Sequence, residues 1–191
     1  MSEVRRARVA PIVVLVVAAL MGGMLWVLAS GDGGDDAEAG IIDSHLLDRA
    51  APEVRSSLLD GGSFELSRRK GSWVVLNFFN STCVPCRAEH PELVKFVEQQ
   101  ASLGPLGAEF YTVVQIGDDL DEVRRFFDER GGDWPVLTDE NGEVFVDFGV
   151  AQVPETFIID PNGVVRVRWA GVIDAVTLAQ LVQQLRNATG L

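Results

Sequence analysis

The sequence predicts an α/β domain built on a mixed β-sheet with helices on both faces. Apolar runs of strand length alternate with amphipathic segments through most of the chain. One run, Trp73–Phe79, is apolar almost throughout, which is typical of a strand that is covered on both faces. A hairpin signal at residues 160–163 and a closing amphipathic helix come later in the chain. This order of elements indicates a central sheet between layers of helices.

The first 29 residues predict a membrane anchor. Residues 1–9 carry three arginines and are interpreted as a cytoplasmic n-region. Residues 10–29 hold no charged side chain, and about 20 helical residues at about 1.5 Å each span the hydrocarbon core of a bilayer. Acidic residues follow, so the positive-inside rule places the rest of the chain outside the cytoplasm. The alternative is a cleaved signal peptide, for which Val27-Leu28-Ala29 resembles a cleavage site.

Residues 30–49 are predicted to form a flexible acidic tether. The stretch Gly31–Gly40 is rich in Gly, Asp and Glu and has no aromatic residue, a composition that does not support a packed core. Ile41–Arg49 is expected to form a short helix. The folded domain is assigned to residues 50–191 and begins with a β-hairpin around the turn Asp60-Gly61-Gly62.

The remaining elements follow from hydrophobic periodicity and from glycine and proline stops. Pro91 is expected to kink the helix that contains it. Helices are predicted at Arg87–Leu103, Asp118–Arg130, Glu143–Phe148 and Asp174–Asn187, and further strands at Phe110–Ile116, Thr156–Ile159 and Val164–Trp169.

Both cysteines of the chain, Cys83 and Cys86, lie at the junction of the central strand and the helix after it. Cys83 is expected at the helix N-terminus, where unpaired N–H groups and the helix dipole favour negative charge. A thiol there loses its proton more readily than a free cysteine, whose pKa is about 8.5, and the thiolate is the form that attacks disulfides. The Cys-x-x-Cys spacing therefore predicts redox chemistry.

Three other uses of this pair compete with redox chemistry. A zinc site with His90 four residues after Cys86 lacks a fourth ligand, because the only other histidine is the distant His45. Covalent c-type haem needs histidine directly after the second cysteine, where Arg87 stands. A purely structural disulfide across so small a loop stabilises little. No cofactor is predicted beyond the Cys83–Cys86 disulfide itself.

Composition narrows the class of partner. A net charge of −12 argues against nucleic acid, which binds basic surfaces. An acidic surface instead favours solubility and selects among protein partners. Disulfides persist outside the cytoplasm, so an exported chain with one close cysteine pair is predicted to act on the redox state of other proteins.

Separated motifs show a resemblance to a known family. They are Ala51-Pro52-Glu53, Asn77-Phe78-Phe79, Cys83-Val84-Pro85-Cys86-Arg87-Ala88-Glu89-His90 and Val153-Pro154-Glu155-Thr156-Phe157. Over about residues 50–188 the chain resembles the membrane-anchored, extracytoplasmic thioredoxin-fold proteins TlpA, ResA and CcmG (DsbE). The resemblance implies a thioredoxin-like fold with an N-terminal β-hairpin and a helix-containing central insertion between Phe110 and Trp134.

The resemblance also implies roles for individual residues. Cys83 is expected to be the nucleophile and Cys86 the resolving thiol. Pro154 is expected to follow a cis peptide bond, and the backbone at Val153 to face the dithiol and pair with an extended substrate. The side chains expected to face the substrate beside the cysteines are Thr82, Val84 and Pro85.

Two positions depart from the family pattern. The family usually has Trp before the first cysteine, where this chain has Thr82, so the choice of partner stays open. Asn77 stands where cytosolic thioredoxins keep a buried Asp, and an amide cannot accept a proton. A different group must handle that proton, and the resemblance implies Glu89, because it follows Cys86 by three residues and the ResA-like proteins have an acid at that place. The alternative for Glu89 is an exposed helix carboxylate.

The predicted function is that of an extracytoplasmic thiol–disulfide oxidoreductase anchored by a single pass in the cell membrane. The resemblance implies a reductant of apocytochrome c haem-site thiols in cytochrome c maturation, supplied with electrons by a membrane protein of the DsbD/CcdA type. Two alternatives remain. One is an oxidant that forms disulfides in exported proteins, and the other is a module in which Cys83 and Cys86 carry Cu(I) to a membrane oxidase.

Overall fold

The computed structural model describes residues 14–24 and 39–190. The chain comprises two units, Met1–Ala37 and Glu38–Leu191. In the first unit, residues 14–24 form an α-helix with exposed side chains. The rest of the predicted n-region, anchor and tether, at residues 1–13 and 25–38, lies outside the described residues. Among the residues that are described, no helix combines the length and the apolar character needed to cross a bilayer.

The second unit is built on a six-stranded sheet with the order β1-β8-β7-β4-β5-β6. The central strand β4 is parallel to β5 and antiparallel to β7, and every one of its residues is buried. The predicted mixed sheet is therefore confirmed. The strands of this sheet are β1 (Gly40–Ile41), β4 (Val74–Phe79), β5 (Glu109–Val114), β6 (Val136–Leu137), β7 (Glu155–Ile159) and β8 (Val165–Ala170).

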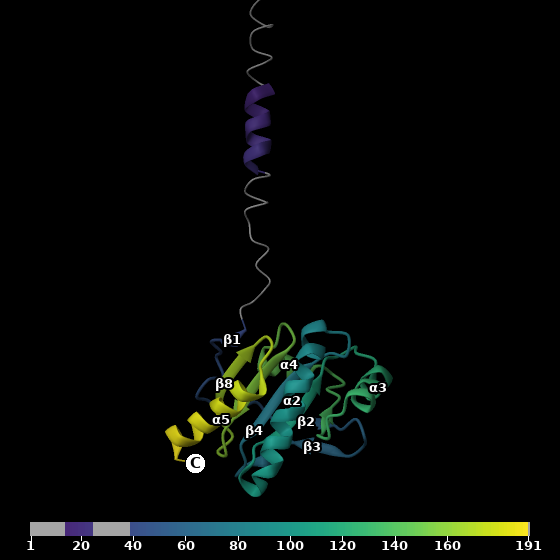
Figure 1. Cartoon of the computed structure of the whole chain (residues 1–191), viewed down its shortest axis with the longest axis vertical. Helices are drawn as coiled ribbons and strands as arrows, with labels where there is room; N and C mark the ends of the chain where they lie inside the picture. Colours follow the sequence, from purple (N-terminus) through teal and green to yellow (C-terminus); the bar gives the residue numbers. More distant parts are fainter. Residues whose placement is uncertain (1–13, 25–38, 191) are drawn as a thin grey trace, which may run out of the picture. The chain divides into compact units, whose positions relative to one another are not determined.

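Helices pack on both faces of this sheet because side chains alternate along β4. Val75 and Phe79 pack in one core cluster with α2, α3 and α5, whereas Leu76 and Phe78 pack in a second cluster with α4. Figure 1 shows α2 and α5 together over the front of the sheet. The helices are α2 (Val84–Ser102), α3 (Leu120–Arg130), α4 (Glu143–Phe148) and α5 (Ala175–Thr189), with short 3-10 turns η1 (Leu66–Arg69) and η2 (Gly104–Leu106).

The predicted N-terminal hairpin is present. Strands β2 (Arg55–Ser57) and β3 (Ser63–Glu65) pair antiparallel. The turn between them needs Gly61 and Gly62 at φ of 94° and 93°, a region that side chains with a Cβ rarely adopt. Phe64 of β3 is buried in the same cluster as α4, so the hairpin closes that face of the core.

Two expectations for residues 40–49 are wrong. Ile41–Arg49 is not a helix, because Gly40 and Ile41 form an edge strand paired with Ala170 and Trp169 of β8. A turn follows, and Leu46 within it is buried. The segment predicted as the last part of a tether therefore belongs to the folded unit. The open backbone groups of β8 recruit this segment, and a partner strand so distant in sequence has no local signature.

Candidate active site

Cys83 and Cys86 lie at the start of α2 and form a disulfide. Cys83 is the N-cap residue, and its Sγ accepts a hydrogen bond from the backbone N of Cys86 at 3.2 Å. Pro85 occupies the first turn, where its missing N–H costs no helical hydrogen bond. Cys83 is half-buried, whereas Cys86 is only 2% exposed. An incoming sulfur therefore reaches Cys83 first.

Polar contacts hold the turn that precedes Cys83. The side-chain Oδ1 of Asn80 accepts hydrogen bonds from the backbone N and the hydroxyl of Thr82, at 2.9 and 2.7 Å. The carboxylate of Asp118 accepts from the backbone N and the hydroxyl of Ser81, both at 2.6 Å. Asp118 lies between β5 and α3, so these bonds attach the start of the central insertion to the turn beside the nucleophile.

Glu89 lies on the buried face of α2 and is 1% exposed. Its carboxylate accepts hydrogen bonds from the side-chain amide of Asn77 at 2.8 Å and from the backbone N of Ile173 at 2.9 Å. Burial raises the pKa of Glu89 from 4.5 to about 8, and the two hydrogen bonds oppose part of that rise. Glu89 is therefore not an exposed helix carboxylate, and it can hold a proton at neutral pH.

Residues 149–154, here called the proline loop, connect α4 to β7 and approach the dithiol. The Val153–Pro154 peptide bond is cis. The carbonyl O of Val153 lies 3.6 Å from Sγ of Cys83. The carbonyl O of Pro154 accepts a hydrogen bond from the backbone N of Gly171 at 2.9 Å. The structure thus brings together Cys83 and Val153, which the sequence separates widely.

One turn after β8 contacts both the proline loop and the buried acid. The backbone N of Gly171 binds Pro154 and the backbone N of Ile173 binds Glu89. Sequence reasoning missed this turn, because backbone donors leave no trace in residue type. It also missed Asp118, which lies in an acidic stretch that has no pattern to distinguish it.

The side chains predicted to face a substrate lie on the solvent side of the dithiol. Val84, between the two cysteines, is 76% exposed, and Thr82 and Pro85 are also exposed. An apolar side chain so exposed at the start of a helix contributes little to the core. It is available for contact with a partner.

His90, which the sequence offered as a zinc ligand, is part of an aromatic cluster. Its Nε2 lies 2.8 Å from the carbonyl O of Gly131, and its ring contacts Phe126, Phe127 and Trp134 at centroid distances of 4.7, 5.3 and 5.3 Å. Burial is the main cause that lowers the pKa of His90, so the ring is neutral near pH 7. His90 thereby packs α2 against the end of α3. Within residues 14–24 and 39–190, no three His, Cys, Asp or Glu side chains gather as metal ligands.

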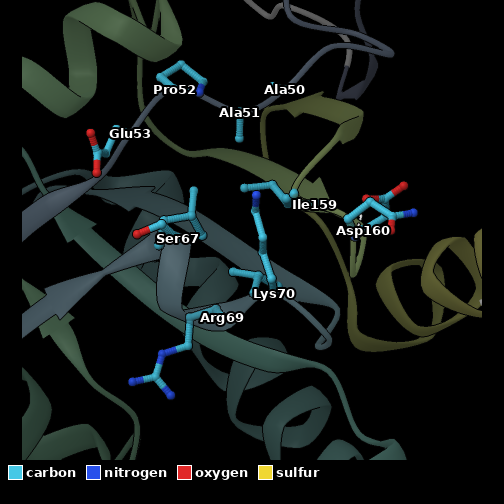
Figure 2. A pocket seen from close by; sticks show the side chains of 13 residues that line it. Ala50, Ala51, Pro52, Glu53, Ser67, Arg69, Lys70, Ile159 and Asp160 are labelled. Atoms are coloured by element: carbon cyan, nitrogen blue, oxygen red, sulfur yellow. Dashed lines mark hydrogen bonds between the residues drawn. The ribbon is translucent and has the colours of Figure 1, made fainter.

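A separate hollow of about 170 Å³ lies between the segment before β2, η1 and the end of β7. Figure 2 shows Lys70 extending from the end of η1 into this hollow, with Ala51 and Ile159 also lining it. Asp160 at its edge already accepts hydrogen bonds from two backbone N–H groups and from Arg166. The residues that line the hollow include none of the predicted site residues, so the dithiol chemistry lies elsewhere.

Comparison with known proteins identifies the family. Residues 47–168 match the AhpC/TSA family. A DsbE homolog of Paracoccus denitrificans, described as a thiol:disulfide interchange protein, is 37% identical over 172 residues, which cover 86% of this chain and 87% of that protein. This chain belongs to the DsbE-type thiol–disulfide interchange proteins.

Further relatives agree with this family. DsbE of Escherichia coli is 32% identical over 172 residues, covering 87% of this chain and 86% of that protein. A thioredoxin-family thiol:disulfide interchange protein of Chlorobium tepidum has a solved structure with a TM-score of 0.64 and 25% identity, covering 75% of this chain and 98% of that one. The predicted thioredoxin-like fold is confirmed. As a member of this family the chain is a thiol–disulfide oxidoreductase, and Cys83 and Cys86 are its redox pair.

Proposed function

We propose that this protein is a reductant of specific partner disulfides outside the cytoplasm. Its substrate is the oxidised haem-site thiol pair of apocytochrome c, which must be reduced before haem is attached. The observation that carries the redox part is the buried Glu89, whose pKa of about 8 keeps a proton available beneath a dithiol with one accessible sulfur. The motifs shared with CcmG (DsbE) support apocytochrome c as the substrate.

Electron transfer proceeds by two exchanges. In the reduced protein, the Cys83 thiolate attacks one sulfur of the partner disulfide, a mixed disulfide forms, and the other partner sulfur leaves as a thiolate. Cys86 then loses its proton and attacks Sγ of Cys83, which releases the second partner sulfur. Two electrons have passed to the partner, and the Cys83–Cys86 disulfide remains. A membrane protein of the DsbD/CcdA type returns the two electrons.

Glu89 handles the proton of the resolving step. It follows Cys86 by three residues, so the two side chains share the buried face of α2. Its raised pKa lets the carboxylate accept a proton from the Cys86 thiol and lets the acid return it near neutral pH. Asn77 orients the carboxyl group, since its amide donates to Glu89.

The substrate chain binds across the dithiol in an extended conformation. Val153 presents its backbone beside Cys83, and Pro154 contributes no N–H that competes for the same acceptors. The exposed side chains Thr82, Val84 and Pro85 contact the residues that flank the partner cysteine.

The N-terminal segment holds the domain at the membrane. Residues 10–29 form the anchor with residues 1–9 in the cytoplasm, and the acidic tether ends at β1. This placement keeps the dithiol within reach of a membrane electron donor and of substrates that emerge at the outer surface.

Trapping with Cys86→Ala tests the proposal. This variant forms the mixed disulfide through Cys83 and cannot resolve it, so a disulfide-linked apocytochrome c or one of its assembly factors accumulates in cells. The matched control Cys83→Ala removes the accessible nucleophile and captures nothing. If Cys86→Ala captures no more than Cys83→Ala does, the exchange mechanism is refuted.

The reduction potential tests the direction of electron flow. A reductant requires a potential well below about −200 mV, whereas strong disulfide-forming oxidants lie near about −120 mV. Equilibration of the Cys83–Cys86 pair with glutathione mixtures of known ratio measures this value. A potential in the oxidant range overturns the reductant assignment while leaving the dithiol chemistry in place.

A further inference from the structure

We propose that Arg168 is a positioning residue. It fixes the proline loop beside the dithiol, so that a peptide disulfide can pair with the backbone of the loop. The inference rests on the part of the proposed function in which the substrate pairs with the backbone at Val153. It does not depend on apocytochrome c being the partner.

One guanidinium group holds both ends of the proline loop. At the start of the loop, Nη2 of Arg168 donates a hydrogen bond to the carbonyl O of Gly149 at 2.8 Å. Just after its end, Nε and Nη2 donate to the carboxylate of Glu155 at 2.7 and 3.1 Å. The loop between these contacts carries Val153, whose carbonyl O lies 3.6 Å from Cys83.

The guanidinium group itself is fixed. Arg168 lies on β8 opposite Phe157 of β7, and its Cζ lies 5.5 Å above that ring. The side chains of Arg168 and Glu155 are 12% and 5% exposed. A planar guanidinium that stacks on an aromatic ring, binds a carboxylate through two hydrogen bonds and is almost shielded from solvent has little freedom to adopt another geometry. The two ends of the proline loop that Arg168 binds are therefore fixed in position as well.

Arg168 acts on the dithiol only through the loop. Its ring partner Phe157 belongs to the core cluster on the α4 face of the sheet, whereas Cys83 and Cys86 pack on the α2 face. Val153 of the proline loop packs against both clusters. Arg168 is therefore a positioning residue and takes no part in electron or proton transfer.

The decisive comparison is between a peptide substrate and a small thiol. Arg168→Met keeps an unbranched side chain of moderate length on β8 and removes all three hydrogen bonds. We expect the KM for a disulfide-linked peptide to rise about tenfold, which corresponds to about 1.4 kcal/mol of lost binding, with kcat within about twofold of wild type. Reduction of the Cys83–Cys86 disulfide by dithiothreitol, which needs no backbone pairing, should keep its rate.

Arg166→Met is the matched control. Arg166 lies two residues earlier on the same strand and donates to the carboxylates of Asp160 at 2.9 Å and Asp48 at 2.7 Å, and neither acceptor belongs to the proline loop. The Arg166→Met variant therefore shows how the loss of an ion pair on β8 changes the peptide KM without a direct effect on the proline loop. An equal rise in peptide KM for Arg166→Met and Arg168→Met overturns the proposal.

A double variant separates positioning from stability. Replacing a buried ion pair by apolar side chains is often neutral for stability, whereas removing one partner is costly. Glu155→Leu with Arg168→Met should therefore recover stability, yet the peptide KM should stay high because the bond to Gly149 is still missing. Hydrogen exchange at the amides of residues 150–153 should be faster in both variants.

Besides an equal rise in both single variants, two further results overturn the inference. One is a peptide KM for Arg168→Met that equals that of wild type, and the other is full recovery of the KM in the double variant. Failure of Cys86→Ala to capture an apocytochrome is a different outcome. It refutes the proposed partner and leaves the peptide comparison valid.

Discussion

The side-chain amide of Asn77 donates a hydrogen bond to Oε1 of Glu89 at 2.8 Å, with both side chains buried. Asn77 comes from β4 and Glu89 from α2, so the bond joins the central strand to the active-site helix. Because the strand residue Asn77 is an amide, the only acid of this pair is Glu89 on the helix, three residues after Cys86. The redox pair and its acid are therefore carried by one helix.

Glu89 should make the stability of the oxidised protein fall as pH rises. Its pKa is about 8 in the folded chain against 4.5 as the ordinary value. Between these values the folded state binds more protons than the unfolded state, so the free energy of unfolding decreases by up to about 1.4 kcal/mol per pH unit. The full contribution is present below pH 4.5 and is lost as pH rises through 8. Urea denaturation across this range measures the slope.

Glu89→Gln should remove that slope, because the amide does not titrate. Glu98→Gln, an exposed position on the same helix, is the control and should keep it. The assignment of the slope to Glu89 is wrong if the Glu89→Gln protein shows the same pH dependence as wild type.

His90 should produce the opposite slope on the acid side. Burial lowers its pKa below 6.5, so the folded state binds fewer protons than the unfolded state near that pH. Its contribution to stability is present above about pH 6.5 and is lost as pH falls through the lower folded value. The clearest measurement is in the Glu89→Gln background. There, adding His90→Phe should remove the part of the stability loss that sets in as pH falls below about 6.5.

Asp118→Ala should loosen the turn before Cys83. It removes two hydrogen bonds from Ser81 to a carboxylate, and bonds to charged groups contribute about 1.5–3 kcal/mol each. We expect a loss of about 3 kcal/mol in the free energy of unfolding. Ser81→Ala removes only the hydroxyl bond and should lose about half as much. Equal losses for the two variants would show that the backbone bond contributes nothing.

Thr82→Trp should broaden the range of substrates. Thr82 is exposed, and its backbone bond to Asn80 survives the change while its hydroxyl bond is lost, so the free energy of unfolding should fall by no more than about 1 kcal/mol. An indole that adds about 40 Å² of apolar contact contributes about 1 kcal/mol, or about a fivefold gain in kcat/KM with a generic peptide disulfide. Thr82→Val, which lacks the aromatic surface, should show no such gain. Equal kcat/KM values for the two variants contradict the prediction.

Local patterns were sufficient for the central strand and the long helices of the fold. The unbroken apolar run before Cys83 predicted β4, and the periodic spacing of apolar residues predicted α2, α3 and α5, with small shifts at their ends. These features are encoded within a few residues of chain, so the sequence alone specifies them. The edge strand at Gly40–Ile41 was missed, because its partner β8 lies far away in the chain.

The candidate active site also combines features that are local in the sequence with contacts between distant segments. The sequence by itself determined the dithiol and its place at a helix N-terminus, and the resemblance to ResA-like proteins, with the three-residue spacing from Cys86, indicated Glu89 as the candidate acid. Only the tertiary structure decided that Glu89 is buried with its pKa raised, since burial by surrounding elements causes the rise and the hydrogen bonds from Asn77 and Ile173 oppose part of it. It agreed with the expected approach of Val153 to Cys83, and it alone revealed that Arg168 binds both ends of the proline loop. Contacts between distant segments depend on how the whole sheet packs, and residue type at one position does not reveal them.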